Sequence, residues 1–229
     1  MRCLARQTVV ASALCMTPLV SWAQHVVTVP VELLHLSNPN LTSPSEGSVS
    51  VLRVSPSFSF VTEDGSFRTE FSLGGVLERS SNTALSANRA DPRLGVDWRW
   101  SLPTSQMALR ASLRDTSTRS VEFDSTGGVT VDSTQRTAEL GADWSRELTP
   151  LTRLAVGITQ TQVDYRTPLL VGYRQSIASG AIEHALDDVS RISVEVGYGS
   201  LKPDSLMLSP QESRSSLFLE YENSLSELW

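Results

Sequence analysis

The chain has 229 residues and a formal net charge of −6, and 40% of its residues are apolar and 7% aromatic. This apolar content argues against a disordered chain. The mild acidity and the lack of any basic tract leave no electrostatic footprint for nucleic acid, so nucleic acid is not an expected partner.

The first 23 residues have the pattern of a secretory signal peptide. "MRCLARQ" supplies two arginines, "TVVASALCMTPLV" supplies a short apolar run, and Ser21 and Ala23 supply the small residues of a cleavage site. A charged start, an apolar middle and a small-x-small end are typical of an exported protein. We therefore predict a signal peptide over residues 1–23, with cleavage after Ala23.

Two other interpretations of this segment are weaker. A membrane anchor needs about 20 apolar residues, whereas this run is shorter and is interrupted by Pro18. Lipidation at Cys15 needs a small preceding residue, and Leu14 occupies that position.

Export limits what the remaining chain, residues 24–229, is expected to be. Both cysteines, Cys3 and Cys15, lie within the signal peptide, so no disulfide and no thiolate metal site are expected after cleavage. No later segment has the length and hydropathy of a transmembrane helix, and none has the pattern of an amphipathic helix. Such a protein is either soluble or enters a membrane as a barrel, and we expect a single domain.

Apolar residues recur at every second position along most of this domain, which predicts strands with two different faces. In "QRTAELGADWSR" the apolar residues are Ala138, Leu140, Ala142 and Trp144. The same alternation marks further strands at 25–34, 51–61, 67–75, 94–100, 107–114, 153–159, 191–199 and 216–223. Pro56 is the weak point of the second strand, because proline cannot donate a hydrogen bond to a sheet.

The connections alternate between short and long. Short turns are predicted at 62–66, 102–106, 148–152 and 186–190. Long polar loops are predicted at 37–47, 78–92, 115–135, 165–174 and 201–213. With one further strand between the last two of these loops, the pattern predicts a ten-stranded, up-and-down antiparallel meander, and outer-membrane barrels alternate their connections in this way.

Three features favour a membrane barrel over a soluble sandwich. The predicted strands of about 10–12 residues suit a tilted membrane crossing, whereas average strands have about 5–6. The second face mixes Gly, Ser and Thr with charges of both signs. Trp98, Trp100, Trp144 and Tyr221 lie near the turns, where an interfacial aromatic belt would place them, although tryptophans of an ordinary core would also fit. The predicted fold class is an all-β, antiparallel up-and-down transmembrane β-barrel over residues 24–229.

The charges of the second face are the candidate functional residues. In a wide barrel they would line an aqueous channel and set its ion preference. In a narrow barrel they would pair with one another and fill the interior. The predicted lumen-facing residues are Arg68, Glu70, Asp97, Arg99, Arg110, Arg114, Glu139, Asp143, Arg153, Glu195, Glu220 and Glu222.

The last residues allow two interpretations. A complete barrel often ends in an aromatic residue, and Trp229 fits that rule. However, "NSLSELW" repeats the pattern of the earlier turns "HALDDVS" and "RELTPLT", and Tyr221, Asn223, Leu225 and Glu227 make a poor lipid-facing set. The pattern favours a fragment of a longer barrel.

The segment "LERSSNTALSANRADPRLGVDW" (77–98) and the hairpins that follow the form "WSRELTPLTRL" (144–154) carry a resemblance to known proteins. The chain from about residue 28 resembles β-barrel porin families of Gram-negative outer membranes, above all those associated with exopolysaccharide and PEP-CTERM protein-sorting systems. The resemblance implies an outer-membrane barrel with more hairpins than this chain has, and it implies no catalytic residues.

No motif of catalysis or metal binding accompanies the strands. His25, His35 and His184 have no metal-type spacing, and no Gly-x-Ser-x-Gly elbow occurs. The acids Glu78, Asp124 and Asp132 fall in predicted outer loops, where solvated acids are common. "STGGVT" (125–130) has no following helix that would make it a phosphate cradle. We expect no enzyme, metal or cofactor.

Three classes of function remain. The first is a porin-like channel of the outer membrane, linked to polysaccharide export or secretion, with outer-membrane lipid and polysaccharide or small solutes as partners. The second is a non-conducting scaffold or adhesion barrel that acts through its outer loops. The third is a soluble exported β protein.

Overall fold

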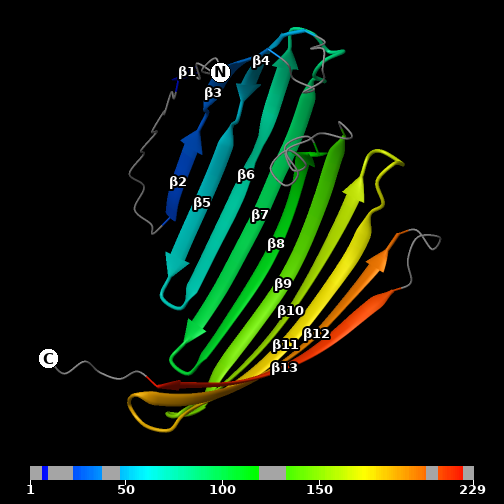
Figure 1. Ribbon diagram of the computed structural model, residues 1–229. Coiled ribbons are helices and arrows are strands. Elements are labelled where there is room, and N and C mark those ends of the chain that lie inside the picture. The colour runs from blue at the N-terminus through cyan, green and yellow to red at the C-terminus, as the bar shows by residue number, and fades with distance from the viewer. Residues whose placement is uncertain (1–6, 10–22, 38–46, 119–132, 205–210, 224–229) are drawn as a thin grey trace, which may run out of the picture.

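The computed structural model describes residues 7–9, 23–37, 47–118, 133–204 and 211–223. All secondary-structure elements of these residues are β-strands, and all belong to one antiparallel sheet (Figure 1). The all-β antiparallel prediction is therefore confirmed. The strands are β1 (Gln7–Val9), β2 (Ala23–Thr28), β3 (Val31–Leu36), β4 (Val49–Val54), β5 (Ser57–Asp64), β6 (Phe67–Ser80), β7 (Arg89–Leu102), β8 (Ser105–Ser117), β9 (Thr134–Thr149), β10 (Thr152–Tyr165), β11 (Tyr173–Ala185), β12 (Ser190–Pro203) and β13 (Glu212–Asn223).

Two prolines divide what would otherwise be continuous strands. Pro30 separates β2 from β3, and Pro56 separates β4 from β5. Both carbonyls still accept hydrogen bonds, Pro30 from the Ser55 N–H at 2.9 Å and Pro56 from the Gly75 N–H at 3.0 Å. The sheet therefore continues past each break, although proline donates nothing itself. With each divided strand counted once and the three-residue β1 left out, the described chain crosses the sheet ten times, as the sequence predicts.

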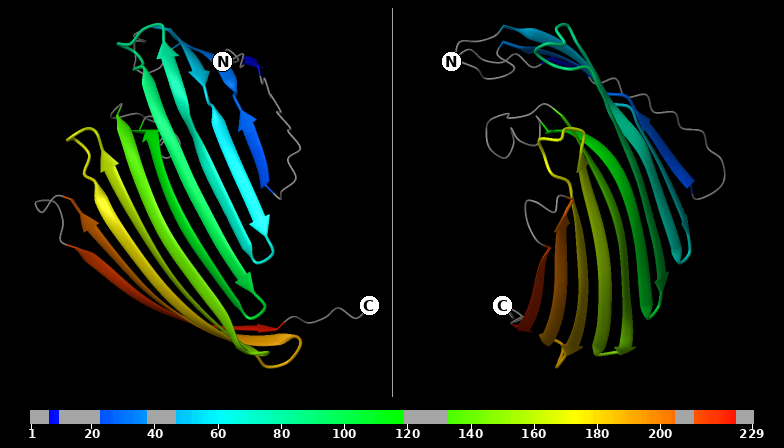
Figure 2. Two further views of the ribbon diagram at one scale, coloured as in Figure 1. Left: turned by 180° about the vertical axis from the view of Figure 1, so that it is seen from behind. Right: turned by 90° about the vertical axis from the view of Figure 1, so that its right-hand side faces the viewer.

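The sheet is a single curved layer with two separate edges. The strand order in the sheet is β1-β3-β4-β6-β7-β8-β9-β10-β11-β12-β13. The paired strands β2 and β5 extend the paired strands β3 and β4 lengthwise, beyond Pro30 and Pro56. Neighbours in the sheet are neighbours in the chain, which is the predicted meander. Figure 2 shows that the sheet twists and curves strongly, as right-handed strand twist requires. The β13 edge and the opposite edge, formed by β1 and β2, do not pair with each other among the described residues.

The predicted turns are confirmed, but the strands extend further at their other ends than the alternation indicates. Tight turns join β5 to β6, β7 to β8, β9 to β10 and β11 to β12. Gly65 in the first turn has φ +55°, a left-handed conformation that glycine adopts without strain. The loop predicted at 78–92 is confined to 81–88, because β6 continues to Ser80 and β7 starts at Arg89. Continued hydrogen-bonding along β6 and β7 outweighs the polar composition of this segment.

The strand pairing keeps every apolar set on one side of the sheet. Directly opposed residues of an antiparallel pair share a face. Trp144 is opposed by Met107 on β8 and by Val156 on β10, and Val96 is opposed by Phe71 and Ala111. We call this side the apolar face and the opposite side, which carries Asp97 and Arg110, the polar face.

Little of the apolar surface is covered by protein. The fully buried apolar side chains of the described residues are Val49, Val51 and Val163, and the pairing places all three on the polar face near the long loops. On the apolar face Leu140 is 63% exposed and Ile158 is 56% exposed. The described part of the chain is thus a sheet without a second layer.

A buried ion pair connects three strands at the loop end of the polar face. The Arg89 Nε lies 3.2 Å from Asp91 Oδ2, and both side chains are 8% exposed. Arg89 also donates to the Ser133 carbonyl at 3.2 Å and to the Thr134 and Ser117 hydroxyls. One guanidinium therefore ties the start of β7 to the end of β8 and the start of β9.

Parts of the sequence predictions lie outside the described residues. Most of the predicted signal peptide, the acids Asp124 and Asp132, the segment 125–130 and the chain end after Asn223 are among them.

Breaking the Arg89–Asp91 pair is expected to destabilise the sheet. Arg89→Met leaves the Asp91 carboxylate buried and unpaired, and such losses cost about 3–5 kcal/mol. The measurement is the free energy of unfolding in urea, with the chain folded in detergent micelles. Arg191→Gln is the matched control, because Arg191 is half exposed in its pairs with Glu183 and Glu222, and exposed pairs contribute about 0–1 kcal/mol. Equal losses of unfolding free energy in Arg89→Met and Arg191→Gln would contradict the stabilising role of the buried Arg89–Asp91 pair.

The turn between β11 and β12 is closed by the Asp187 carboxylate. Asp187 Oδ1 accepts hydrogen bonds from the Val189 N–H at 2.9 Å and the Ser190 N–H at 2.7 Å. The Val189 N–H first, then the Ser190 side chain and N–H, hold the pKa of Asp187 below its usual range. Because the folded-state pKa is lowered, this carboxylate stabilises the turn above its unfolded pKa, and the stabilisation is lost as the pH falls through the folded value.

Asp187→Asn keeps the acceptor oxygen but removes the titration. The difference in unfolding free energy between the wild type and this variant should be constant above about pH 5 and should decline as the pH falls below about 4. Urea unfolding at a series of pH values measures it. A difference that does not change with pH would show that the charge of Asp187 has no part in the turn.

Candidate functional site

The polar face gathers the residues that the sequence singles out. The strand pairing places all twelve predicted lumen-facing residues on this one side, on strands from β6 to β13. Arg68 opposes Arg99, Glu70 opposes Asp97, and Asp97 opposes Arg110 on its other side. The charged residues at alternate positions of each strand thus lie on the same side as those of the neighbouring strands, and together they form one continuous charged surface.

Some of these charges meet as ion pairs. Arg110 Nη2 contacts Asp143 Oδ2 across β8 and β9, and Arg68 Nη2 lies 3.7 Å from Glu70 Oε2. Glu222 lies 3.2 Å from Arg191, a residue outside the predicted set. These groups are all about half exposed, and such pairs contribute little to stability. They adjust the local charge of the surface more than they hold the sheet together.

Other members of the predicted set are not brought together. Within the described residues, no ion pair or side-chain hydrogen bond is formed by Asp97, Arg99, Arg114, Glu139, Glu195 or Glu220. Arg153 donates to the Ser145 hydroxyl at 3.0 Å and has no acidic partner within ion-pair distance. Half of the twelve charges are therefore available to water, ions or solutes.

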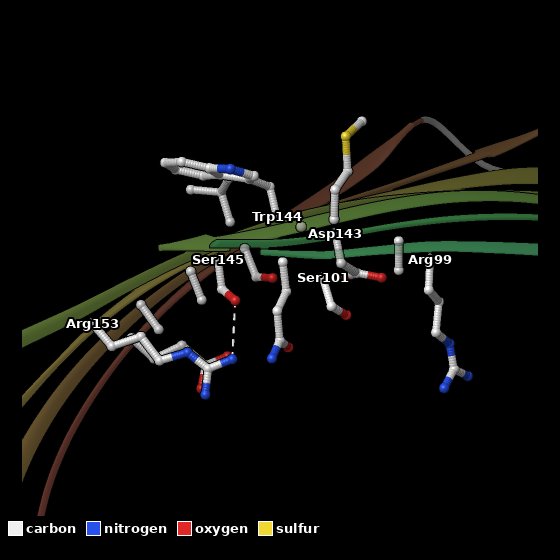
Figure 3. A pocket seen from close by; sticks show the side chains of 15 residues that line it. Arg99, Ser101, Asp143, Trp144, Ser145 and Arg153 are labelled. Atoms are coloured by element: carbon white, nitrogen blue, oxygen red, sulfur yellow. Dashed lines mark hydrogen bonds between the residues drawn. The ribbon is translucent and has the colours of Figure 1, made fainter. Parts of the chain in front are cut away.

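A hollow of about 300 Å³ lies on this face at the turn end of β7 to β12. Figure 3 shows Arg99, Ser101, Ser145 and Arg153 on one side of the sheet and Trp144 on the other. Most of the other lining residues also belong to the polar face: Gln106, Ala108, Asp143, Ala155, Gly157, Ser179, Ala181 and Glu195. The hollow combines charges of both signs with hydroxyl and amide groups, so it is suited to hydrated polar solutes.

Small residues make room for these polar side chains. A Cβ atom on Gly157 would lie 2.8 Å from Asp143 Oδ1, and one on Gly197 would lie 2.6 Å from Ser216 Oγ. On Gly95 it would lie 2.5 Å from Ser72 Oγ. Glycine at these positions therefore lets the opposed side chain lie across the strand.

Sequence reasoning missed several charged residues of the polar face. Arg53 donates to Glu78 Oε1 at 2.7 Å and lies 3.4 Å from Glu32 Oε2, which ties β3, β4 and β6 together. The prediction that Glu78 is a loop acid is wrong, because β6 continues to Ser80 and carries Glu78 into the sheet. Arg89, Asp91 and Arg93 were missed for the same reason. Alternation continued into 78–80 and 89–93 would have found Glu78, Arg89, Asp91 and Arg93, whereas Glu32 and Arg53 lie in strands that were already predicted.

The apolar face ends in charge on the loop side. Asp115, only 1% exposed, receives two hydrogen bonds from Arg136, at 2.8 and 2.9 Å, and lies 3.6 Å from Arg166. Arg174 donates to Gln162 at 3.2 Å, and the pairing places it on the same side. On the loop side the band of apolar side chains therefore stops at the ion pairs of Asp115 with Arg136 and Arg166 and at the polar contact of Arg174 with Gln162.

Aromatic side chains mark the turn side of the same face. The rings of Phe67 and Trp100 stack with centroids 5.9 Å apart, and Trp98 lies 6.2 Å from Phe67. Trp144 donates its indole N–H to the Ser105 hydroxyl at 3.1 Å, and the Tyr221 hydroxyl accepts from Asn223 at 3.1 Å. Each of the two polar groups is satisfied beside an apolar surface, which is characteristic of residues at an interface.

Residues of catalytic or metal-binding type are dispersed. His35 contacts the Ser50 hydroxyl at 3.1 Å and His184 the Thr152 hydroxyl at 2.9 Å. Among the described residues, no group of three or more His, Cys, Asp or Glu has the arrangement of a metal site. In the same part of the chain no helix has the length and hydropathy to cross a membrane.

Comparison with known proteins adds no relative. No family model matches the chain, and no curated protein and no solved structure is similar to it.

Proposed function

We propose that this chain is a membrane-spanning β-barrel protein of a Gram-negative outer membrane, and that its polar face lines a porin-like channel. The observation that carries the proposal is the uncovered apolar face. It extends over neighbouring strands from β6 to β13, and Leu140, Ile158 and Leu219 on it are 63%, 56% and 75% exposed. A face of this extent in water would be an aggregation surface. Lipid would cover it.

The length of the apolar band supports the same environment. On β9 the apolar face runs from Arg136 to Arg146, ten residues apart, with apolar side chains at each alternate position between them. At about 3.3 Å per residue this is about 33 Å along the strand. A tilt of about 40° reduces it to about 25 Å, the height of the apolar band of outer-membrane barrels. The aromatic cluster at the turn side fits the interfacial belt of such proteins.

The polar face supports a channel over a closed scaffold. A lumen filled by paired side chains needs complementary partners, whereas Arg99, Arg114 and Glu195 have none among the described residues. The hollow near the turns adds room for water. The resemblance to barrels of polysaccharide export and protein sorting extends the proposal to that setting, with polysaccharide or small solutes as cargo. The two alternatives are a soluble exported β protein and a non-conducting adhesion scaffold, and the following experiments distinguish them from the channel.

Adjacent residues of β10 test membrane insertion. Ile158 lies on the apolar face opposite Ala142, near the middle of the band, and Thr159 lies on the polar face opposite Gly141. Arginine on the lipid side at the bilayer midplane costs about 2–4 kcal/mol. Ile158→Arg should therefore reduce folding into lipid vesicles, measured by protease protection and heat-modifiable gel migration, whereas Thr159→Arg should fold like the wild type.

If both arginine variants insert equally well, Ile158 does not face lipid and the barrel is refuted. If vesicles do not protect the wild type from protease and it remains monomeric in water, the chain is a soluble exported β protein and not a membrane barrel.

Planar-bilayer conductance tests the channel separately from insertion. The inserted chain is expected to give stable steps of current, because the unpaired charges of the polar face would keep the lumen hydrated. Inserted protein that is protected from protease but gives no steps would contradict the channel and favour the scaffold or adhesion barrel.

A further inference from the structure

Two arginines of the polar face oppose each other directly at the loop side of β7 and β8. Arg93 is the pairing partner of Arg114. Side chains at such positions start about 4.5–5.5 Å apart at their Cβ atoms, and like charges placed there destabilise a sheet. An arrangement of this kind needs a compensating negative charge.

The surrounding acids do not supply that charge. Asp91, two residues before Arg93, is held by Arg89 at 3.2 Å. Glu139 is diagonal to Arg114 and forms no ion pair with it. The neighbouring opposed pair, Gly95 and Ser112, is uncharged. Neither Arg93 nor Arg114 has an ion pair or a side-chain hydrogen bond among the described residues.

The other opposed arginines of this face are different. Next to Arg68 and Arg99 lies an opposed pair of acids, Glu70 and Asp97, so two positive and two negative side chains alternate there. Arg68 is within 3.7 Å of Glu70. The Arg93–Arg114 pair is the uncompensated one of the two.

A buried hydroxyl completes the local arrangement. Thr137 on β9 opposes Arg114 on the side away from Arg93, so the three residues lie in one row across β7, β8 and β9. Thr137 is only 7% exposed, and its hydroxyl makes no hydrogen bond among the described residues. Buried polar groups are nearly always satisfied, so a free hydroxyl in this place calls for a partner.

We infer that Arg93, Arg114 and Thr137 form a binding site for a phosphate-class oxyanion. Two guanidinium groups match the oxygens of a phosphate through paired N–H donors, and the hydroxyl supplies a further donor. A phosphate dianion balances both arginines, whereas one carboxylate or one chloride balances a single arginine. The inference rests on the proposed function, because a lumen is what would bring solutes to this face, and it names the solute class of the channel.

The test measures binding, so that it does not depend on conductance. The full mature chain is folded in detergent micelles, and its β-sheet content is verified by circular dichroism. Inorganic phosphate is titrated calorimetrically at constant ionic strength, with chloride as the reference anion. Phosphate is expected to bind at least tenfold more tightly than chloride.

Substitutions assign the binding to the site. Arg93→Gln and Arg114→Gln should each weaken phosphate binding at least tenfold, and Thr137→Val, which keeps the side-chain shape, should weaken it severalfold. Arg214→Gln is the matched control, because Arg214 is another exposed, unpaired arginine of the polar face, on β13. It should leave the affinity unchanged.

Thermal unfolding adds a readout that a merely structural role would not produce. Without phosphate, Arg114→Gln should melt at a higher temperature than the wild type because it relieves repulsion. Phosphate should raise the melting temperature of the wild type and of Arg214→Gln clearly more than that of Arg114→Gln. A parallel titration with glycerol phosphate tests whether the site takes a phosphate group carried on a larger molecule. Tighter binding of inorganic phosphate indicates free phosphate as the ligand, and tighter binding of glycerol phosphate indicates a phosphate ester; either result supports the site.

Phosphate affinity equal to that of chloride, or equal losses in Arg114→Gln and Arg214→Gln, would overturn the inference. Phosphate binding by a chain that fails to conduct would refute the channel and leave the site. Conductance without phosphate binding would refute the site and leave the channel.

Discussion

The arrangement of this protein depends on one constraint. Apolar and polar side chains alternate within each strand, and the register between strands keeps the apolar ones on the same side of the sheet. A shift of one residue would move a whole strand's apolar side chains to the polar face. The short turns prevent such a shift, since each allows few geometries, and the divided strands at Pro30 and Pro56 remain hydrogen-bonded across their breaks. The outcome is a single layer whose apolar side is not covered by any other described part of the chain.

Because no second layer packs on the apolar side of the described sheet, the buried contacts that stabilise the sheet lie elsewhere. The buried apolar side chains of the described residues lie on the polar face near the loops, and the buried Arg89–Asp91 pair lies at the same end of the sheet. The Asp115–Arg136 fork lies at the same end of the apolar face. The buried valines and the buried ionic groups of the described sheet thus lie at the loop ends of the strands, and the turn ends carry the aromatic cluster and the hollow.

The polar face follows from the same geometry. On this side glycine at 95, 157 and 197 accommodates the neighbouring hydroxyl and carboxylate groups. Where charges fit together they pair at the surface, as Arg110 and Asp143 do. Where they do not, as at Arg93 and Arg114, two guanidinium groups stay without an acidic partner among the described residues, and there we propose the oxyanion site.

The sequence by itself determined the all-β antiparallel class, the ten crossings, the four tight turns and the division of residues between two faces. A period of two is a local property, and short turns leave a meander as the simplest topology. The sequence did not reveal that 78–80 and 89–93 belong to strands, because their polar composition resembles a loop and only pairing with neighbouring strands makes them part of the sheet. Only the tertiary structure decided which charges meet: whether Arg93 opposes Arg114 or Arg110 depends on the register between strands, and register arises from turn geometry and cross-strand packing together.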